Sequence, residues 1–142
     1  MARKSSTSYD AQAAIAEARS YIGTRWRHRG RNRYGIDCIG LVVRAVEAGG
    51  VLMRDRVDYG REPWRDGLER EMREHFGRPV RVMRPGDVVL MRWDGHAEPS
   101  HVGLIAGTPD RLTLIHSYSE IAVTEHGIDD MWRNRILMVF RP

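Results

Sequence analysis

The apolar residues of this chain of 142 residues change their spacing near Val80. Before Val80 they recur every three or four residues, which is typical of amphipathic helices. After it they form short runs separated by turns, which is typical of strands. Helices followed by strands predict an α+β domain with a small antiparallel sheet and disfavour a parallel α/β sheet. Helices are expected over about 8–22, 38–48 and 68–76, and strands over 88–91, 101–106, 112–117, 121–124 and 136–140.

The length of the chain leaves room for one hydrophobic core, and no linker or internal repeat divides it. We therefore expect a single domain over residues 1–142. No apolar run is long enough for a membrane helix, so no membrane insertion is expected. Residues 1–6 begin basic, but Asp10, Gln12 and Glu17 interrupt the segment where a signal peptide would have its apolar centre.

The formal net charge of +4 favours an anionic partner, which could be nucleic acid, a membrane surface or the bacterial wall. Much of this charge lies in an arginine-rich segment, residues 25–33, which also holds Trp26 and His28. The segment could be a solvated loop, or it could stack on and pair with nucleic acid. Its place shortly before the only cysteine favours a substrate cleft instead, and no nucleic-acid partner is expected.

Cys38 is the only cysteine, so the domain cannot contain an internal disulfide. Asp37 is well placed to cap the second helix, which puts Cys38 in the first turn of that helix. Unpaired N–H groups and the helix dipole stabilise a thiolate there, so we expect a lowered pKa for Cys38. A buried thiol without function would lie more naturally in mid-helix, beside Val42 and Val46. The position favours a reactive cysteine.

Two histidines lie on strands that are expected to form a hairpin. If Ala106 and Arg111 close the turn, His101 lies directly opposite His116, with Cβ atoms about 5 Å apart. One imidazole would then act as a base while the other fixes its tautomer. The spacing favours Cys38 as nucleophile, His101 as base and then acid, and His116 as orienting group. The backbone N–H of Cys38 would help to hold an oxyanion.

Other interpretations of the histidines stay open at this point. His116 could be a structural histidine, and a zinc site could form from His96, His101, His116 and Asp94. The helical His-Glu-x-x-His pattern of many zinc enzymes is absent, so no metal is expected. The other histidines are expected at the surface: His28, His75, His96 and His126.

Five motifs in a fixed order are shared with a known family. They are residues 23–26 (Gly-Thr-Arg-Trp), 35–42 (Gly-Ile-Asp-Cys-Ile-Gly-Leu-Val), 85–89 (Pro-Gly-Asp-Val-Val), 100–104 (Ser-His-Val-Gly-Leu) and 115–116 (Ile-His). On these motifs the chain resembles the NlpC-type cell-wall cysteine peptidases, a compact papain-like family. The resemblance implies a helical half that presents Cys38 to His101 and to a third polar residue, His116. It also implies hydrolysis of the bond between D-γ-glutamate and diaminopimelate or lysine in peptidoglycan stem peptides, without a cofactor.

Within this family the chain looks closest to the branch found in phage tails. The grounds are its short length, the absence of a recognisable signal peptide, the run at residues 28–31 and the segment at residues 125–133. The resemblance then implies tail-tip proteins as partners and a location in the virion, from which the protein acts on the cell wall. A weakly active structural module of the tail tip and a peptidoglycan amidase with the same thiol are the alternatives.

The sequence departs from the family pattern at two positions near the cysteine. Trp26 stands where many members carry a tyrosine thought to assist the oxyanion, and Ile39 stands where many carry a serine that contacts the substrate. An indole N–H can still donate one hydrogen bond, but with a different reach. With Asp37 and Ser100, these residues are the expected substrate contacts.

Overall fold

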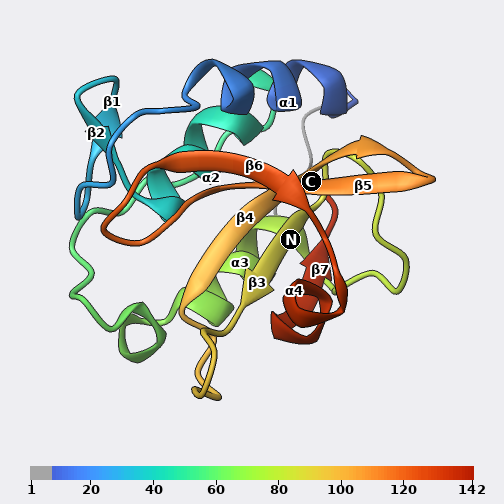
Figure 1. The fold of residues 1–142 in the computed structure, drawn as a ribbon. Helices are drawn as coiled ribbons and strands as arrows, with labels where there is room; N and C mark the ends of the chain where they lie inside the picture. Colours follow the sequence, from blue (N-terminus) through green and yellow to red (C-terminus); the bar gives the residue numbers. More distant parts are fainter. Residues whose placement is uncertain (1–7) are drawn as a thin grey trace.

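A computed structural model of the chain describes residues 8–142 (Figure 1). The first half supplies three α-helices: α1 (Ala11–Ser20), α2 (Cys38–Ala48) and α3 (Leu68–Phe76). The second half supplies the strands β3 (Val88–Met91), β4 (His101–Thr108), β5 (Arg111–Ser117), β6 (Val123–Gly127) and β7 (Ile136–Phe140). They form one antiparallel sheet in the order β6-β5-β4-β3-β7, which confirms the predicted α+β class. The signal-peptide argument concerns residues 1–6, which lie outside the described residues.

Two aspartates set the starts of the first two helices. Asp37 accepts a hydrogen bond from Gly40 N–H, so it caps α2 as predicted and makes Cys38 the first helical residue. Asp10 caps α1 in the same way by accepting from Ala13 N–H, so that helix begins three residues later than Ser8. Each cap satisfies a backbone donor that the first turn of a helix leaves without a partner.

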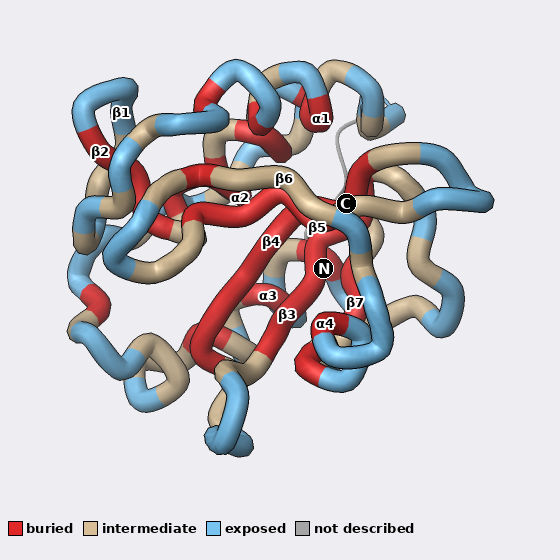
Figure 2. Tube along the Cα trace, viewed as in Figure 1, coloured by how far each residue is buried: buried red, intermediate tan, exposed pale blue. Residues whose placement is uncertain are grey.

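The sheet packs on both of its faces, so its central strands are almost entirely buried (Figure 2). On one face the three helices cover a core that includes Leu41, Val46, Leu90 and Leu104. The opposite face carries a smaller cluster. That cluster consists of Val89, Met91, Ile105, Leu114, Trp132 and Val139. The alternation of side chains along β3 and β4 therefore supplies both cores.

The hairpin between β4 and β5 has a different register from the predicted one. Thr108, not Ala106, pairs with Arg111, and Gly107 adopts a positive φ of 80° beside the turn. The tighter turn lets β4 continue beyond Ala106 and shifts the strands by two residues, so His101 and His116 are not directly opposite. Because side chains alternate with a period of two, the shift keeps both histidines on the same face of the sheet.

Three short elements were not predicted. A hairpin of β1 (Arg31–Asn32) and β2 (Gly35–Ile36) begins in the arginine-rich segment and ends just before Asp37, and a 3₁₀ helix, η1 (Pro63–Asp66), precedes α3. The helix α4 (Asp130–Arg135) precedes β7 and buries Trp132 on the sheet face opposite α1 and α2. None of the helices within residues 8–142 is both long and apolar enough to cross a membrane.

Candidate active site

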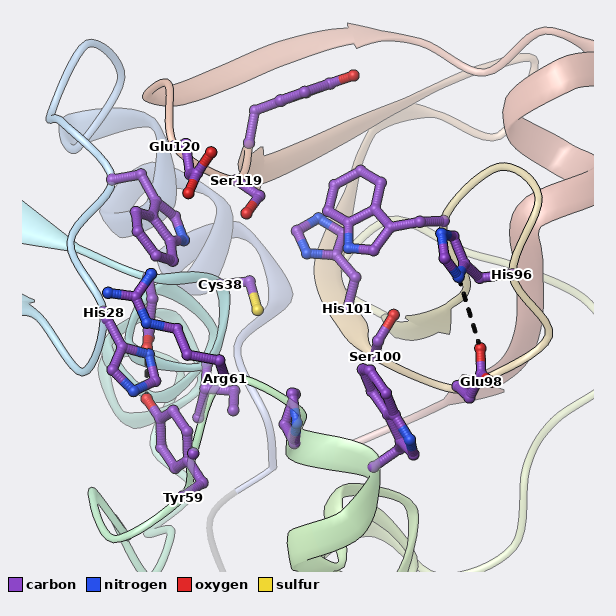
Figure 3. A pocket seen from close by; sticks show the side chains of 18 of the residues that line it. His28, Cys38, Tyr59, Arg61, His96, Glu98, Ser100, His101, Ser119 and Glu120 are labelled. Carbon is purple, nitrogen blue, oxygen red and sulfur yellow. Dashed lines mark hydrogen bonds and ion pairs between the residues drawn. The ribbon is translucent and has the colours of Figure 1, made fainter.

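A pocket of about 600 Å³ lies between the start of α2 and the first residue of β4. Cys38 enters it from α2 and His101 from β4, so the two side chains face one cavity (Figure 3). The four expected substrate contacts also line this pocket: Trp26, Asp37, Ile39 and Ser100. His116 is not part of its lining, but it contacts His101 from behind.

The sulfur of Cys38 lies against the beginning of β4. Cys38 is partly buried, and the backbone groups of Val102 and Ile39 hydrogen-bond to its sulfur. Since Val102 directly follows His101, the thiol lies at the end of the strand that carries the imidazole. The spacing in the sequence could not show that the sheet presents His101 toward Cys38. In the structure both residues line the same pocket.

The expected lowering of the Cys38 pKa is wrong for the protein without substrate. Burial raises the pKa of the Cys38 thiol to about 12, and the negative charge of Asp37 adds to the increase. The hydrogen bonds from Val102 and Ile39 and the charge of Arg31 oppose it. The helix start does stabilise a thiolate, but removal from water and an adjacent carboxylate outweigh it. The resting cysteine is a neutral thiol.

His101 and His116 form a hydrogen bond between His101 Nε2 and His116 Nδ1, 2.7 Å apart. They meet diagonally across β4 and β5, and Gly103 makes this possible. A Cβ atom on Gly103 would lie 3.2 Å from His116 Cβ and 2.7 Å from Leu114 Cδ1. The predicted contact is therefore present, although it arises from a register that was not predicted.

The hydrogen bond to His116 occupies one nitrogen of His101 and leaves Nδ1 available toward the pocket. His101 is 2% exposed, and burial together with the neighbouring His116 holds its pKa well below 6.5. Burial and His126 lower the pKa of His116 to about 3. Both rings are thus neutral near physiological pH, which is the form in which an imidazole can accept a proton.

A third ring extends this pair. His116 Nε2 lies 2.8 Å from His126 Nε2, and His126 Nδ1 lies 2.8 Å from the carbonyl oxygen of Gly127. His126 is partly exposed, as expected of a surface histidine, but its bond to His116 was not predicted. The sequence interpretation missed His126 because it ended the fourth strand at residue 124, whereas β6 continues to Gly127. If the strand had been extended beyond Thr124, the alternation of side chains would have placed His126 on the same face of the sheet as His116.

Three aromatic side chains enclose the histidines on the sheet face opposite α2. The Trp93 ring centroid lies 4.3 Å from that of His101, and the Trp132 centroid lies 5.2 Å from that of His116. The Tyr118 ring centroid lies 5.5 Å from the ring centroids of both Trp93 and His116. This apolar cover explains why His116 is fully buried although it is polar.

Asp37 is occupied by the protein itself. One carboxylate oxygen accepts from Arg31 and Gly40 N–H, and the other accepts from Arg29 N–H and the Tyr59 hydroxyl. The side chain is 3% exposed. It therefore acts as a cap and a buried junction beside the pocket, and all four contacts come from the chain.

The other expected contacts form different parts of the pocket wall. Trp26 packs beneath Arg61, whose guanidinium carbon lies 5.4 Å from the indole centroid. Ile39 also packs against the core on the helical face of the sheet. Ser100 is buried, and its backbone N–H donates to the carbonyl of Met91.

The arginine-rich segment is built into the structure more than a solvated loop would be. Arg31 donates to Asp37, to Asp55 and to the carbonyl of Arg56, while Arg29 donates to the carbonyl of Tyr59. These bonds fasten the irregular segment near residues 55–59 to the start of α2. The arginine-rich segment contributes Trp26 and His28 to one wall of the pocket, and the segment that it fastens contributes Tyr59, while Arg61 follows directly.

The proposed zinc ligands do not form a metal site. His101 and His116 use ring nitrogens to bond to one another, and His96 lies beside Glu98 on the pocket rim. Among residues 8–142 no group of three His, Cys, Asp or Glu side chains is arranged to hold a metal ion.

Comparison with known proteins gives a consistent family. The model of the NlpC/P60 family matches residues 23–141. The probable endopeptidase NlpC of Escherichia coli (strain K12) is 27% identical over 120 residues, covering 82% of this chain and 67% of that protein.

Solved structures of this family share the fold. An NlpC/P60 family protein from Bacillus cereus ATCC 10987 superposes with a TM-score of 0.68 at 19% identity over 92% of this chain, which spans only 39% of that protein. The NlpC/p60 domain of the peptidoglycan hydrolase SagA gives a TM-score of 0.62 at 21% identity, with 93% and 98% of the two chains covered. RipD from Mycobacterium tuberculosis, described as a non-catalytic domain adapted to peptidoglycan binding, gives 0.60 at 16% identity, with 95% and 98% covered.

Proposed function

Because the chain belongs to the NlpC/P60 family, we propose that it is a cysteine peptidase that hydrolyses the stem peptides of bacterial peptidoglycan. The observation that carries this proposal is the shared pocket of Cys38 and His101, with the His101 ring oriented by His116. The likeness to a probable endopeptidase and to a domain of a peptidoglycan hydrolase supports the choice of substrate.

The reaction begins with a neutral thiol and a neutral imidazole. As the sulfur of Cys38 attacks the scissile carbonyl, its proton passes to His101 Nδ1, the nitrogen that the bond to His116 leaves available. The tetrahedral intermediate collapses when His101 returns this proton to the leaving amine, and a thioester to Cys38 is formed. His101 then takes a proton from water, which attacks the thioester and releases the acid and the thiol.

The developing oxyanion needs donors close to the sulfur. Cys38 is the first residue of α2, so its N–H has no acceptor within the helix and can serve in this role. Trp26 lines the same pocket and provides one indole N–H as a second donor. This assignment gives Trp26 the part that a tyrosine plays in many family members.

Charged groups of both signs surround the pocket. Arg61 lies on one side of Cys38, while Glu98 and Glu120 lie on other parts of the rim (Figure 3). His28, beside Arg61, is a neutral donor or acceptor there, because burial and the neighbouring arginines lower its pKa. A stem peptide carries both carboxylates and an amine, and such a mixed rim can pair with each of them. We assign the cut to the bond between D-γ-glutamate and diaminopimelate on the resemblance to the family.

The place of action is part of the same proposal. We infer that the protein is carried in a phage tail tip, contacts other tail-tip proteins and cuts the wall during penetration. The resemblance of the sequence to the tail-associated branch supports this inference. Mass spectrometry of purified particles tests it, because the protein should be present in tails separated from free host protein.

A second candidate is a wall-binding or structural module without catalysis. The description of RipD as non-catalytic, together with Trp26 and Ile39 at the two divergent positions, favours it. A third is an amidase that cuts between sugar and peptide with the same thiol. The retention of Cys38, His101 and His116 in one connected arrangement favours a hydrolase over the binding module.

One experiment separates these candidates. Purified protein is incubated with peptidoglycan that contains diaminopimelate, beside the variants Cys38→Ala and His101→Ala, and the fragments are identified by mass spectrometry. We expect peptides cut after D-glutamate from the wild type and none from either variant. Cleavage at the sugar–peptide amide would identify an amidase, and binding without any release would identify the non-catalytic module.

A further inference from the structure

The hydrogen bonds of the histidine row define the proton position on every ring. A carbonyl oxygen only accepts, so His126 Nδ1 carries the proton that bonds to Gly127. In a neutral ring Nε2 of His126 must then accept, and His116 Nε2–H is its donor. His116 Nδ1 is consequently an acceptor and takes the proton of His101 Nε2. His101 Nδ1 is left as a bare lone pair at the pocket.

The row also runs from the interior toward the surface. His101 and His116 are 2% and 0% exposed, whereas His126 is partly exposed. His126 lines a second, open hollow on the molecule, which does not include Cys38 or His101. Trp132 packs along this path, with its ring centroid 4.5 Å from that of His126. The three rings therefore connect the active-site pocket to a separate region of solvent.

We propose that His126 is a positioning residue and the outlet of a proton relay that starts at Cys38. When His101 Nδ1 takes the thiol proton, the proton on His101 Nε2 passes to His116 Nδ1. The proton on His116 Nε2 passes in turn to His126 Nε2. The sulfur becomes negative, His101 and His116 end as neutral rings of the opposite tautomer, and the positive charge lies on His126.

The relay answers a specific difficulty of this site. An imidazolium at His101 would be enclosed by protein, where a charge is poorly solvated. At His126 the same charge faces water and several ionisable groups. The turn before β5 contributes Asp110 and Arg111 to the hollow, and the region of α4 contributes Asp129 and Arg133. His116 faces His126 from β5. When the leaving amine needs a proton, the transfers reverse and His101 Nδ1 supplies it.

The proposal rests on the proposed thiol chemistry and has two parts: His126 fixes the tautomers of the other rings, and it accepts the proton. Two substitutions separate these parts. His126→Gln keeps an oxygen that can accept from His116 Nε2–H, so it preserves the tautomers but cannot take a proton. His126→Leu removes the acceptor as well. His75→Gln, on α3 and away from the sheet face, is the matched control. Because Cys38 is the only thiol, its alkylation by iodoacetamide can be followed without labelled substrate.

We expect the apparent pKa of Cys38 alkylation to rise by about one unit in His126→Gln, which is about a tenfold slower reaction near neutral pH. His126→Leu should be slower still. Nitrogen-15 spectra of labelled histidine should show His101 protonated at Nε2 in the wild type and in His126→Gln, and a mixture of tautomers in His126→Leu. The alkylation profile of His75→Gln should match the wild type.

The results that overturn the proposal are distinct from failure of the peptidase reaction. Alkylation profiles of both His126 variants within about twofold of the wild type would refute any role of His126 in the site. Wild-type alkylation in His126→Gln with a loss in His126→Leu would refute the proton outlet, because positioning alone would then suffice. These measurements need no wall substrate, so they are decided even if the protein does not cut peptidoglycan.

Discussion

Two buried imidazoles make the stability of this protein sensitive to acid. His101 and His116 have pKa values below that of a free imidazole, chiefly because burial disfavours their charged forms. The unfolded chain therefore binds protons at a higher pH than the folded protein does. Stability is unaffected while both states are neutral and falls once the unfolded imidazoles begin to take up protons.

We expect the free energy of unfolding to decrease as the pH falls below about 6.5, by about 1.4 kcal/mol per pH unit for each buried ring. The contribution of His116 is lost progressively until the pH reaches about 3, the pKa of that ring in the folded protein. Urea unfolding between about pH 7 and about pH 5 checks this, in a range where most carboxylates are still ionised. An unfolding midpoint that does not change over this interval would contradict it.

Asp37 illustrates how a single residue can serve two structural roles beside a reactive group. It caps α2 and pairs with Arg31, whose side chain is 12% exposed. Replacement by alanine would leave the Tyr59 hydroxyl and the Arg29 N–H without this acceptor, whereas Arg31 would keep its bonds to Asp55 and to the carbonyl of Arg56. Asp10 offers a matched comparison, because it caps α1 with a similar bond at an exposed position.

We expect Asp37→Ala to lower the free energy of unfolding by about 2 to 4 kcal/mol, because it removes the N-cap and leaves the buried Tyr59 hydroxyl without its acceptor. Asp10→Ala should cost about 1 kcal/mol, which is the usual value for loss of an N-cap. Chemical denaturation of both variants measures the difference. Equal losses would show that the contacts of Asp37 with Arg31 and Tyr59 contribute nothing beyond the cap.

At the scale of elements, the diagonal contact between His101 on β4 and His116 on β5 depends on Gly103. The absence of a side chain there leaves space for His116 to reach His101 diagonally. Gly127 lies at the end of the neighbouring strand β6, and a Cβ atom there would meet no heavy atom within 4 Å. The two glycines form a natural pair for substitution.

We expect Gly103→Ala to lower stability by about 1 to 3 kcal/mol, because the added methyl group displaces Leu114 and His116. Hydrolysis of wall peptides should fall with it, since the bond between the two histidines is disturbed. Gly127→Ala should change stability by less than about 0.5 kcal/mol. Thermal unfolding and initial rates of both variants check this, and a full rate in Gly103→Ala would show that His116 is not needed in its present place.

The elements with strong local signals were predicted well from sequence. The cap at Asp37 and the apolar spacing after it placed α2, and the bounds of β3 and β7 agree with the predicted strands. The short hairpin β1–β2 and the six-residue helix α4 were missed, because so few residues carry no clear periodicity. The β4–β5 register was wrong because Gly107 and Thr108 look like turn residues but continue the strand.

The candidate site was only partly accessible to the same reasoning. The three expected catalytic residues lie together, since a two-residue shift in register does not move a side chain to the other face. The pKa of Cys38 was misjudged because burial depends on tertiary packing, which a capping pattern does not report. His126 was missed because its strand extends beyond the predicted end.

At the scale of the whole molecule, the helical half and the sheet contribute different parts of the chemistry. The helices supply the nucleophile and, through the arginine-rich segment, one wall of the pocket. The sheet supplies the base and a row of rings on the face away from α2. The pocket forms where these halves meet, so its geometry depends on the packing of α2 against β4.

The row of rings terminates on a main-chain oxygen, that of Gly127. Every amino acid carries such an oxygen, so no replacement at position 127 can delete it while β6 keeps its pairing with β5. An acceptor supplied by a side chain could be lost through a single substitution. The order of donors and acceptors along the three histidines therefore depends on the pairing of β5 with β6. Residue 127 can be substituted without reversing that order.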